Sequence, residues 1–161
     1  MKKLFLCSFT VLLFVACNNE KTNQPDELKI NNVEIIKGIY TSFSQGDIEG
    51  ILASFDENIV WNEAENFPYA DGNPYIGGQA IVEGVFARVG GEWDNFIVDE
   101  RKVYNMDNNM VLVTGRYKGT NKATGKSINA QLVHHWTLKD GKIIQFQQYT
   151  DTKQVADALT E

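Results

Sequence analysis

The sequence is poor in cysteine: Cys7 and Cys17 are the only two among its 161 residues. Two thiols, one of them inside an N-terminal apolar segment, cannot build a disulfide framework or the cysteine-rich ligand set of a structural zinc site. A hydrophobic core must therefore hold the chain together. A hydrophobic content of 43% in a chain of this length is enough for one such domain.

Basic charge is also scarce. The 15 Lys and Arg residues are outnumbered by 21 Asp and Glu, for a net charge of -6, and the basic residues cluster only at the extreme N-terminus. A nucleic-acid-binding surface needs a basic patch, so nucleic acid is excluded as a partner.

Sequence signals for cofactors are missing as well. The glycine pairs at 77–78 and 90–91 lack the strand, loop and lysine of a phosphate-binding motif. His134 and His135 are neighbours on a predicted strand and point to opposite faces, so they are not a pair of metal ligands. We expect no cofactor and no metal.

One long apolar run stands out, residues 4–16, directly after Lys2 and Lys3. A membrane-spanning helix needs about 20 apolar residues, so this run has the features of a signal peptide. The sequence at its end, LFVAC, resembles the lipobox of bacterial lipoproteins, in which the signal is removed and the cysteine is lipidated. By that resemblance Cys17 becomes the first mature residue. An ordinary secretory signal and an uncleaved anchor are the alternatives.

The chain thus divides into a signal peptide at 1–16, a polar tether at 17–27 and one domain at 28–161. We expect the domain to be lipid-anchored in the cell envelope. Asn18 stands where an aspartate commonly retains lipoproteins in the inner membrane, so the resemblance favours the outer membrane.

The first half of the domain is predicted to be mostly helical. Residues 28–45 carry apolar side chains at helical spacing, and Gly46 is a suitable C-cap. Asp47 is placed to cap a second helix, and 79–89 carries a third apolar stripe. A short strand at 58–63 and a loop rich in Gly, Pro and Asn precede that third helix.

From about Trp93 the hydrophobic period changes to two. The pattern predicts a closing helix at 151–160, after strands at 95–105, 109–119, 127–139 and 142–150. Helices, one strand, another helix and then an antiparallel meander predict an α+β fold, in which helices cover one face of a curved antiparallel sheet.

The last hairpin carries an unusual mixture of side chains. Its turn, Asp140-Gly141, predicts a register that puts large apolar and hydrogen-bonding groups on one face. That face would hold Leu132, His134, Trp136, Leu138, Ile143, Gln145, Gln147 and Tyr149.

Trp61 and Glu63, two residues apart on the strand 58–63, share a face and would join this set. A carboxylate, an imidazole, amides, a phenol and two indoles suit a small-molecule pocket. The alternative is a sealed core in which His134 is hydrogen-bonded and idle.

The segments YTSFSQGDIEGILASFDENIVWNE, YIGGQAI and HHWTLKDGKIIQFQQYTD together resemble the SnoaL-like branch of the nuclear transport factor 2-like superfamily. The resemblance covers about residues 30–160. It implies a cone in which N-terminal helices and a bent sheet enclose one cavity, often as a dimer through the sheet's outer face. Steroid delta-isomerases, polyketide cyclases and limonene epoxide hydrolases share this fold, so isomerase, cyclase or hydrolase chemistry on a small apolar substrate is implied.

The resemblance also assigns individual residues. Glu63 occupies the place of the proton-shuttling aspartate of steroid isomerases, and His134 that of their protonated aspartic acid. Ile39 takes the place of their tyrosine, with Tyr40 next to it, which argues against steroid isomerisation itself. Asp151 lies near the late acidic residue of the polyketide cyclases.

Two functions remain open. In an enzyme, Glu63 would be a general base while His134 and Tyr149 donate hydrogen bonds to an oxyanion, with Asp151 as a further catalytic candidate. In a binding or carrier protein, the cavity would hold an apolar molecule unchanged. The ligand contacts expected in both cases are Trp61, Tyr40, Tyr117, Trp136 and Gln147.

A third expectation is a homodimer through the opposite face of the hairpin. The residues predicted for that face are Val133, His135, Ile144, Phe146, Gln148 and Thr150.

The lipid anchor can be tested in cells by changing Cys17→Ser. Without the thiol no acyl chain can be attached and the lipobox is lost, so we expect the altered chain to differ from the wild type in processing and in its association with the membrane fraction. Two acyl chains anchor a protein stably, whereas an unmodified chain has no such affinity. Unchanged processing and membrane association would contradict the lipid anchor.

Overall fold

The computed structural model describes residues 31–161. The predicted signal peptide and tether, with Cys17, lie outside the described residues, as does the start of the domain at 28–30. Within the described part, every helix is too short or too polar to span a bilayer.

The first two helices begin and end at the capping residues that the sequence predicts. Helix α1 (Asn32–Gln45) begins after Asn31 and ends at Gly46, whose φ of 69° is the left-handed conformation that glycine adopts without strain. Helix α2 (Ile48–Ala53) begins after Asp47, whose carboxylate accepts the backbone N–H of Gly50 at 2.9 Å.

The third predicted helix is a continuous segment with an irregular centre. It runs through α3 (Gly78–Ile81), the π-helical turn η2 (Val82–Phe86) and α4 (Ala87–Glu92). The apolar stripe predicted the helix, but the π-helical turn has no sequence signal that we recognised. Such turns occur often at functional sites.

The described strands form one six-stranded sheet in the order β2-β1-β6-β5-β4-β3. Strand β1 runs parallel to β6, and all other neighbours are antiparallel. The sheet is therefore mixed, whereas the sequence predicted an antiparallel one. The strands are β1 (Phe55–Asn62), β2 (Tyr75–Ile76), β3 (Trp93–Met106), β4 (Met110–Asn121), β5 (Ser127–Lys139) and β6 (Lys142–Thr150).

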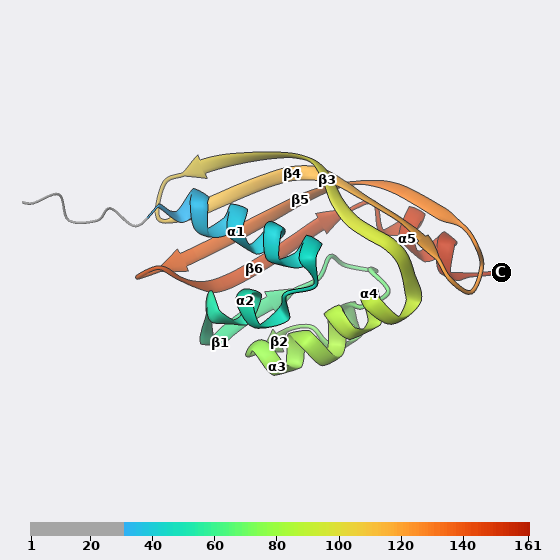
Figure 1. Cartoon of the computed structure of the whole chain (residues 1–161), viewed down its shortest axis with the longest axis horizontal. Helices are drawn as coiled ribbons and strands as arrows, with labels where there is room; N and C mark the ends of the chain where they lie inside the picture. The colour runs from blue at the N-terminus through green and yellow to red at the C-terminus, as the bar shows by residue number, and fades with distance from the viewer. Residues whose placement is uncertain (1–30) are drawn as a thin grey trace, which may run out of the picture.

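The predicted α+β architecture is confirmed. Figure 1 shows a strongly curved sheet with α1, α2 and the α3–α4 segment gathered on one side of it. The short helix η1 (Ala70–Gly72) lies in the loop before β2, and α5 (Thr152–Leu159) closes the chain and packs on β5. The space between the sheet and the helices holds the hydrophobic core.

The predicted turn of the last hairpin is confirmed, but its predicted register is wrong. Asp140 and Gly141 both have positive φ, of 49° and 78°, and form the turn. Leu138 pairs with Ile143 as expected, after which a bulge leaves Ile144 without a counterpart. The pairs beyond it are Thr137–Gln145, Trp136–Phe146, His135–Gln147, His134–Gln148 and Val133–Tyr149.

One inserted residue moves the rest of β6 to the opposite face, because side chains alternate along a strand. Phe146 and Gln148 are buried inside with Trp136 and His134, whereas Tyr149 is 57% exposed. The predicted dimer surface therefore cannot contain Phe146 or Gln148. Homodimerisation itself stays a prediction.

Two substitutions on β6 distinguish the observed register from the predicted one. Phe146→Ala removes a fully buried ring and should lower the free energy of unfolding by roughly 3–5 kcal/mol. Gln145→Ala removes an exposed side chain and should change it by less than about 0.5 kcal/mol. Chemical denaturation of both variants measures the difference, and a larger loss for Gln145→Ala would support the predicted register instead.

Candidate functional site

A cavity of about 60 Å³ lies between the helices and the inner face of the sheet. Most of its lining side chains are aromatic. The polar ones are Tyr40, Glu63, Tyr117, His134 and Gln148, and the apolar ones are Ile39, Phe43, Ile51, Trp61, Phe67, Val85, Phe86, Val89, Phe96, Val98, Trp136 and Phe146.

Four of the lining side chains are only half-buried. They are Phe43 on α1, Phe86 on η2, and Phe96 and Val98 on β3. The ring of Phe43 lies 6.1 Å from that of Phe86 and 6.5 Å from that of Phe96. Phe43 therefore packs beside both Phe86 and Phe96 in the less buried part of the lining, next to the π-helical turn.

Glu63 directly follows β1, which ends at Asn62, and is only 2% exposed. Trp61 and Glu63 share a face, as predicted, and the indole N–H of Trp61 donates to Oε1 of Glu63 at 2.6 Å. The other carboxyl oxygen, Oε2, is buried and has no hydrogen-bond partner among the described residues. An unpartnered buried polar atom in a cavity wall is costly, so it points to a role in the site.

Burial raises the pKa of Glu63 from 4.5 to about 7, although the hydrogen bond from Trp61 and the nearby side-chain amide of Gln148 oppose this shift. The folded chain thus favours the neutral carboxyl. The resulting contribution to stability is complete below pH 4.5 and is lost as the pH rises through about 7. Near neutral pH both protonation states are populated, as a general base or acid requires.

His134 is buried between two tyrosines. Its Nδ1 lies 2.7 Å from the hydroxyl of Tyr40, and its Nε2 lies 2.7 Å from the hydroxyl of Tyr117. Trp136 donates to the hydroxyl oxygen of Tyr40 at 3.1 Å, and Gln148 donates to that of Tyr117 at 2.9 Å. The resemblance placed His134 in the cavity, but both of its nitrogens are occupied by protein.

Burial lowers the pKa of His134 from 6.5 to about 3, so the ring is neutral at physiological pH. Stability from this neutral state is complete above pH 6.5 and is lost as the pH falls toward 3. Burial also raises the pKa of Tyr40 and Tyr117, and the negative charge of Glu63 raises that of Tyr117 further. Both tyrosines therefore keep their protons.

Counting hydrogens in this cluster identifies a free donor. A neutral imidazole carries one N–H, so it donates to one tyrosine and accepts from the other. In either tautomer, the tyrosine that accepts from His134 keeps a hydroxyl hydrogen that the cluster does not use. Both tyrosines belong to the cavity lining, so the free hydrogen is available to a ligand that reaches that hydroxyl.

Three predicted site residues on or after β6 do not reach the cavity, because the bulge reverses the faces of that strand. Tyr149 is exposed on the outer face, and Gln147 is half-buried and donates to the backbone of Gln148 at 2.9 Å. Asp151 caps α5 by accepting the backbone N–H of Gln154 at 3.1 Å. Gln148, which the predicted register placed outside, is the β6 amide that reaches the cavity.

The other predicted ligand contacts, Trp61, Tyr40, Tyr117 and Trp136, all line the cavity. The structure also adds Phe43, Phe86 and Phe96, which sequence analysis did not single out. Within residues 31–161, no group of three or more His, Cys, Asp or Glu side chains converges as metal ligands would.

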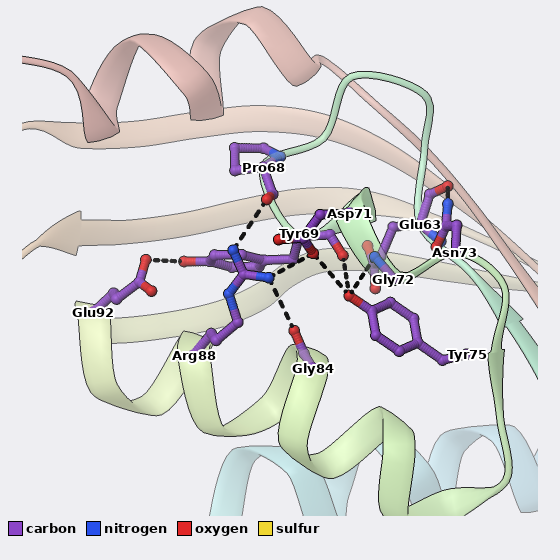
Figure 2. Close-up of polar contacts among 10 residues, drawn as sticks. All are labelled: Glu63, Pro68, Tyr69, Asp71, Gly72, Asn73, Tyr75, Gly84, Arg88 and Glu92. Carbon is purple, nitrogen blue, oxygen red and sulfur yellow. Dashed lines mark hydrogen bonds and ion pairs between the residues drawn. The ribbon is translucent and has the colours of Figure 1, made fainter.

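The loop between β1 and β2 supplies one wall of the cavity through Phe67, which is 5% exposed. Figure 2 shows how the helix behind the loop holds it in place. The guanidinium of Arg88 donates to Asp71 at 2.7 Å and to the carbonyl of Pro68 at 3.2 Å, and it lies 4.3 Å from the centre of the Tyr69 ring.

Two tyrosines fix the same loop from inside. The hydroxyl of Tyr69 donates to Glu92 at 2.7 Å, and that of Tyr75 donates to the carbonyl of Tyr69 at 2.7 Å (Figure 2). These contacts hold the loop in place as a wall of the cavity. Tyr69 and Tyr75 themselves do not line the cavity.

The protonation state of His134 can be observed by nitrogen NMR. Because the ring is buried, we expect one protonated and one unprotonated nitrogen from pH 8 down to pH 5, with no titration in that range. A His134→Gln variant assigns the signals. An imidazolium signal for His134 at pH 5 to 6 would contradict the neutral cluster.

Comparison with known proteins agrees with this architecture. The family model of the SnoaL-like domain matches residues 36–146. A search of curated proteins found no match. Among solved structures, an NTF2-like protein from Burkholderia thailandensis is 33% identical, with a TM-score of 0.71, and the match covers 81% of this chain and 98% of that one.

Two other structures show the same fold. An NTF2-like protein from Burkholderia pseudomallei is 20% identical, with a TM-score of 0.73 and coverage of 81% of this chain and 98% of that chain. TerC, co-crystallised with polyporic acid, is 26% identical, with a TM-score of 0.70 and coverage of 79% and 96%. With its family match over residues 36–146 and its six-stranded curved sheet, this chain belongs to the SnoaL-like domain family within the NTF2-like fold.

Proposed function

We propose that the domain binds a compact, largely apolar molecule and transfers a proton on it, with Glu63 as the general base. The substrate would carry an oxygen that accepts a hydrogen bond and a nearby hydrogen that a carboxylate can remove. This is chemistry of the isomerase or cyclase kind, and it needs no cofactor.

The observation that carries the proposal is the free oxygen of Glu63. Oε2 is buried and without a partner in the wall of the cavity, while Trp61 holds Oε1 at 2.6 Å. With a pKa of about 7, the carboxyl can take up and return a proton at neutral pH. A carboxyl needed only for packing would be expected to have both oxygens satisfied.

The hydrogen-bond donor to the substrate is a tyrosine, which revises the role predicted for His134 and Tyr149. His134 is a neutral link between Tyr40 and Tyr117, and it leaves one of their hydroxyl hydrogens for the ligand. Of the two, Tyr117 is the better candidate, because the charge of Glu63 raises its pKa, which indicates that this hydroxyl is near the carboxyl and could contact the same compact substrate. A donor aimed at developing negative charge lowers the barrier to proton removal.

The size and charge of the cavity restrict the substrate. Its volume of about 60 Å³ is well below the roughly 300–1,000 Å³ of sites for drug-sized ligands, so the substrate is compact. None of the lining side chains is Lys or Arg, so an anionic ligand would find no counter-charge. The aromatic walls favour a flat molecule.

A non-catalytic binding or carrier function is the second candidate. TerC, which shares the fold, was co-crystallised with polyporic acid, and this favours small-molecule binding as an alternative. The same hydrogen-bonding groups would then orient a ligand that leaves unchanged. In either case we propose that the lipid on Cys17 holds the domain at the envelope and that it acts as a homodimer.

Proton transfer can be tested without knowing the natural substrate. Wild-type chain and a Glu63→Gln variant are incubated in D2O with a panel of small cyclic enones and ketones, and deuterium entering next to the carbonyl is followed by NMR. We expect the wild type to accelerate exchange of at least one compound. Glu63→Gln should lose roughly 100-fold or more of that rate, the range expected of a general base.

Glu65→Gln is the matched control, because the same change is made at an exposed side chain two residues away. It should exchange at the wild-type rate. If Glu63→Gln exchanges as fast as the wild type, Glu63 is not the base. Ligand binding by all three proteins without exchange in any of them would favour the carrier function.

A further inference from the structure

Glu63 is held in place at a point where the regular strand has already ended. Strand β1 stops at Asn62, and its register with β2 pairs Val60 with Ile76 and Trp61 with Tyr75. Continuing this antiparallel register by two residues places Asn73 opposite Glu63. The backbone N–H of Asn73 is not free to pair, because it donates to the carbonyl of Ala70 at 3.1 Å.

The side chain of Asn73 takes over the missing pairing. Its Oδ1 accepts the backbone N–H of Glu63 at 3.0 Å, and its Nδ2 donates to the backbone carbonyl of Glu63 at 2.8 Å. Figure 2 shows the two residues side by side at the edge of the loop. A side-chain amide has a carbonyl oxygen that accepts and an NH2 group that donates, so it can pair with both the N–H and the C=O of one residue.

A second side-chain amide acts from the other edge of β1. The parallel register with β6 pairs Trp61 with Phe146 and Asn62 with Gln147, so its continuation reaches Gln148. Oε1 of Gln148 accepts the backbone N–H of Ala64 at 3.2 Å, while its Nε2 donates to Tyr117.

We infer that Asn73 is a positioning residue for Glu63: its amide continues the β1 ladder past the last strand residue and fixes the direction in which the carboxyl enters the cavity. Gln148 assists from the opposite edge and connects the same backbone to Tyr117. Because side chains alternate along an extended strand, preserving this ladder keeps Glu63 on the face of Trp61. The inference deepens the proposed function, on which the role of Glu63 rests.

Asn73 is suitable for a clean test because it acts from outside the cavity. It is absent from the lining and is exposed to solvent. The titratable groups that share the cavity with Glu63 are Tyr117 on β4, His134 on β5 and Tyr40 on α1, and Arg101 lies over the outer side of the Tyr40 ring at 5.2 Å. A change at Asn73 touches none of these four.

The test follows the indole N–H signal of Trp61 by NMR as a function of pH in the full chain. This N–H donates to Glu63, so its chemical shift reports the titration of the carboxyl, and the indole signal whose titration is lost in Glu63→Gln is assigned to Trp61. Asn73→Ala should lower the midpoint by about one pH unit or more, because a loosened carboxylate gains water. The backbone N–H of Glu63 should exchange with solvent at least about 10-fold faster.

Asn58→Ala is the control, since it removes an exposed amide from the same strand, and it should leave both readouts unchanged.

Should Asn73→Ala not fold, Asn73→Asp is used instead. Aspartate keeps the acceptor for the N–H of Glu63 but loses the donor to its carbonyl, and its negative charge itself raises the pKa of Glu63. The readout for this variant is therefore the exchange rate of the Glu63 N–H, which should lie between those of the wild type and Asn73→Ala. An unaltered midpoint and exchange rate in the folded Asn73 variant would overturn the inference. Both readouts are made without substrate, so failure of the proton-transfer assay leaves this result independent.

Discussion

Burial of the Glu63 carboxyl beside the indole of Trp61 is the constraint around which the site is built. A carboxylate in an apolar cavity is unstable unless it is paired, and here the described residues satisfy only Oε1. Burial therefore raises the pKa of the carboxyl to about 7, so that its neutral and charged forms are both populated near neutral pH. Aromatic rings surround the carboxyl, and the fixed loop contributes Phe67 to the same cavity wall.

The polar cluster that shares the cavity with Glu63 is neutral and internally hydrogen-bonded. Tyr40, His134 and Tyr117 are buried polar groups, and they satisfy one another while staying neutral. Because three hydrogens serve two contacts, one hydroxyl hydrogen remains for a ligand. The Glu63 carboxyl, which can be neutral or negatively charged, thus shares one small cavity with a neutral tyrosine hydroxyl that can donate a hydrogen bond. That combination suits proton transfer between carbon and a carboxylate, with the negative charge collected on a substrate oxygen.

Much of this arrangement follows from local sequence signals. Gly46, Asp47 and the Asp140-Gly141 turn fix where elements begin and end, and the two-residue spacing of Trp61 and Glu63 correctly puts them on one face. The bulge at Ile144 could not be predicted, because the sequence Ile143-Ile144 suits either a regular strand or an inserted residue. Because of this one inserted residue, the side chain of Gln148 lies inside and that of Tyr149 lies on the outer face. The pairing of Asn73 with Glu63 was equally hidden, because it joins a loop side chain to a strand backbone ten residues away.

Infrared spectroscopy of the Glu63 carboxyl tests the account most directly. The difference between spectra of the wild type and Glu63→Gln isolates the C=O stretch of the protonated acid, whose intensity can be followed from pH 4 to pH 9. The account predicts a band at the high frequency of a carboxyl with few hydrogen bonds, disappearing with a midpoint near pH 7. A midpoint near 4.5, the value of an ordinary glutamate, would contradict it.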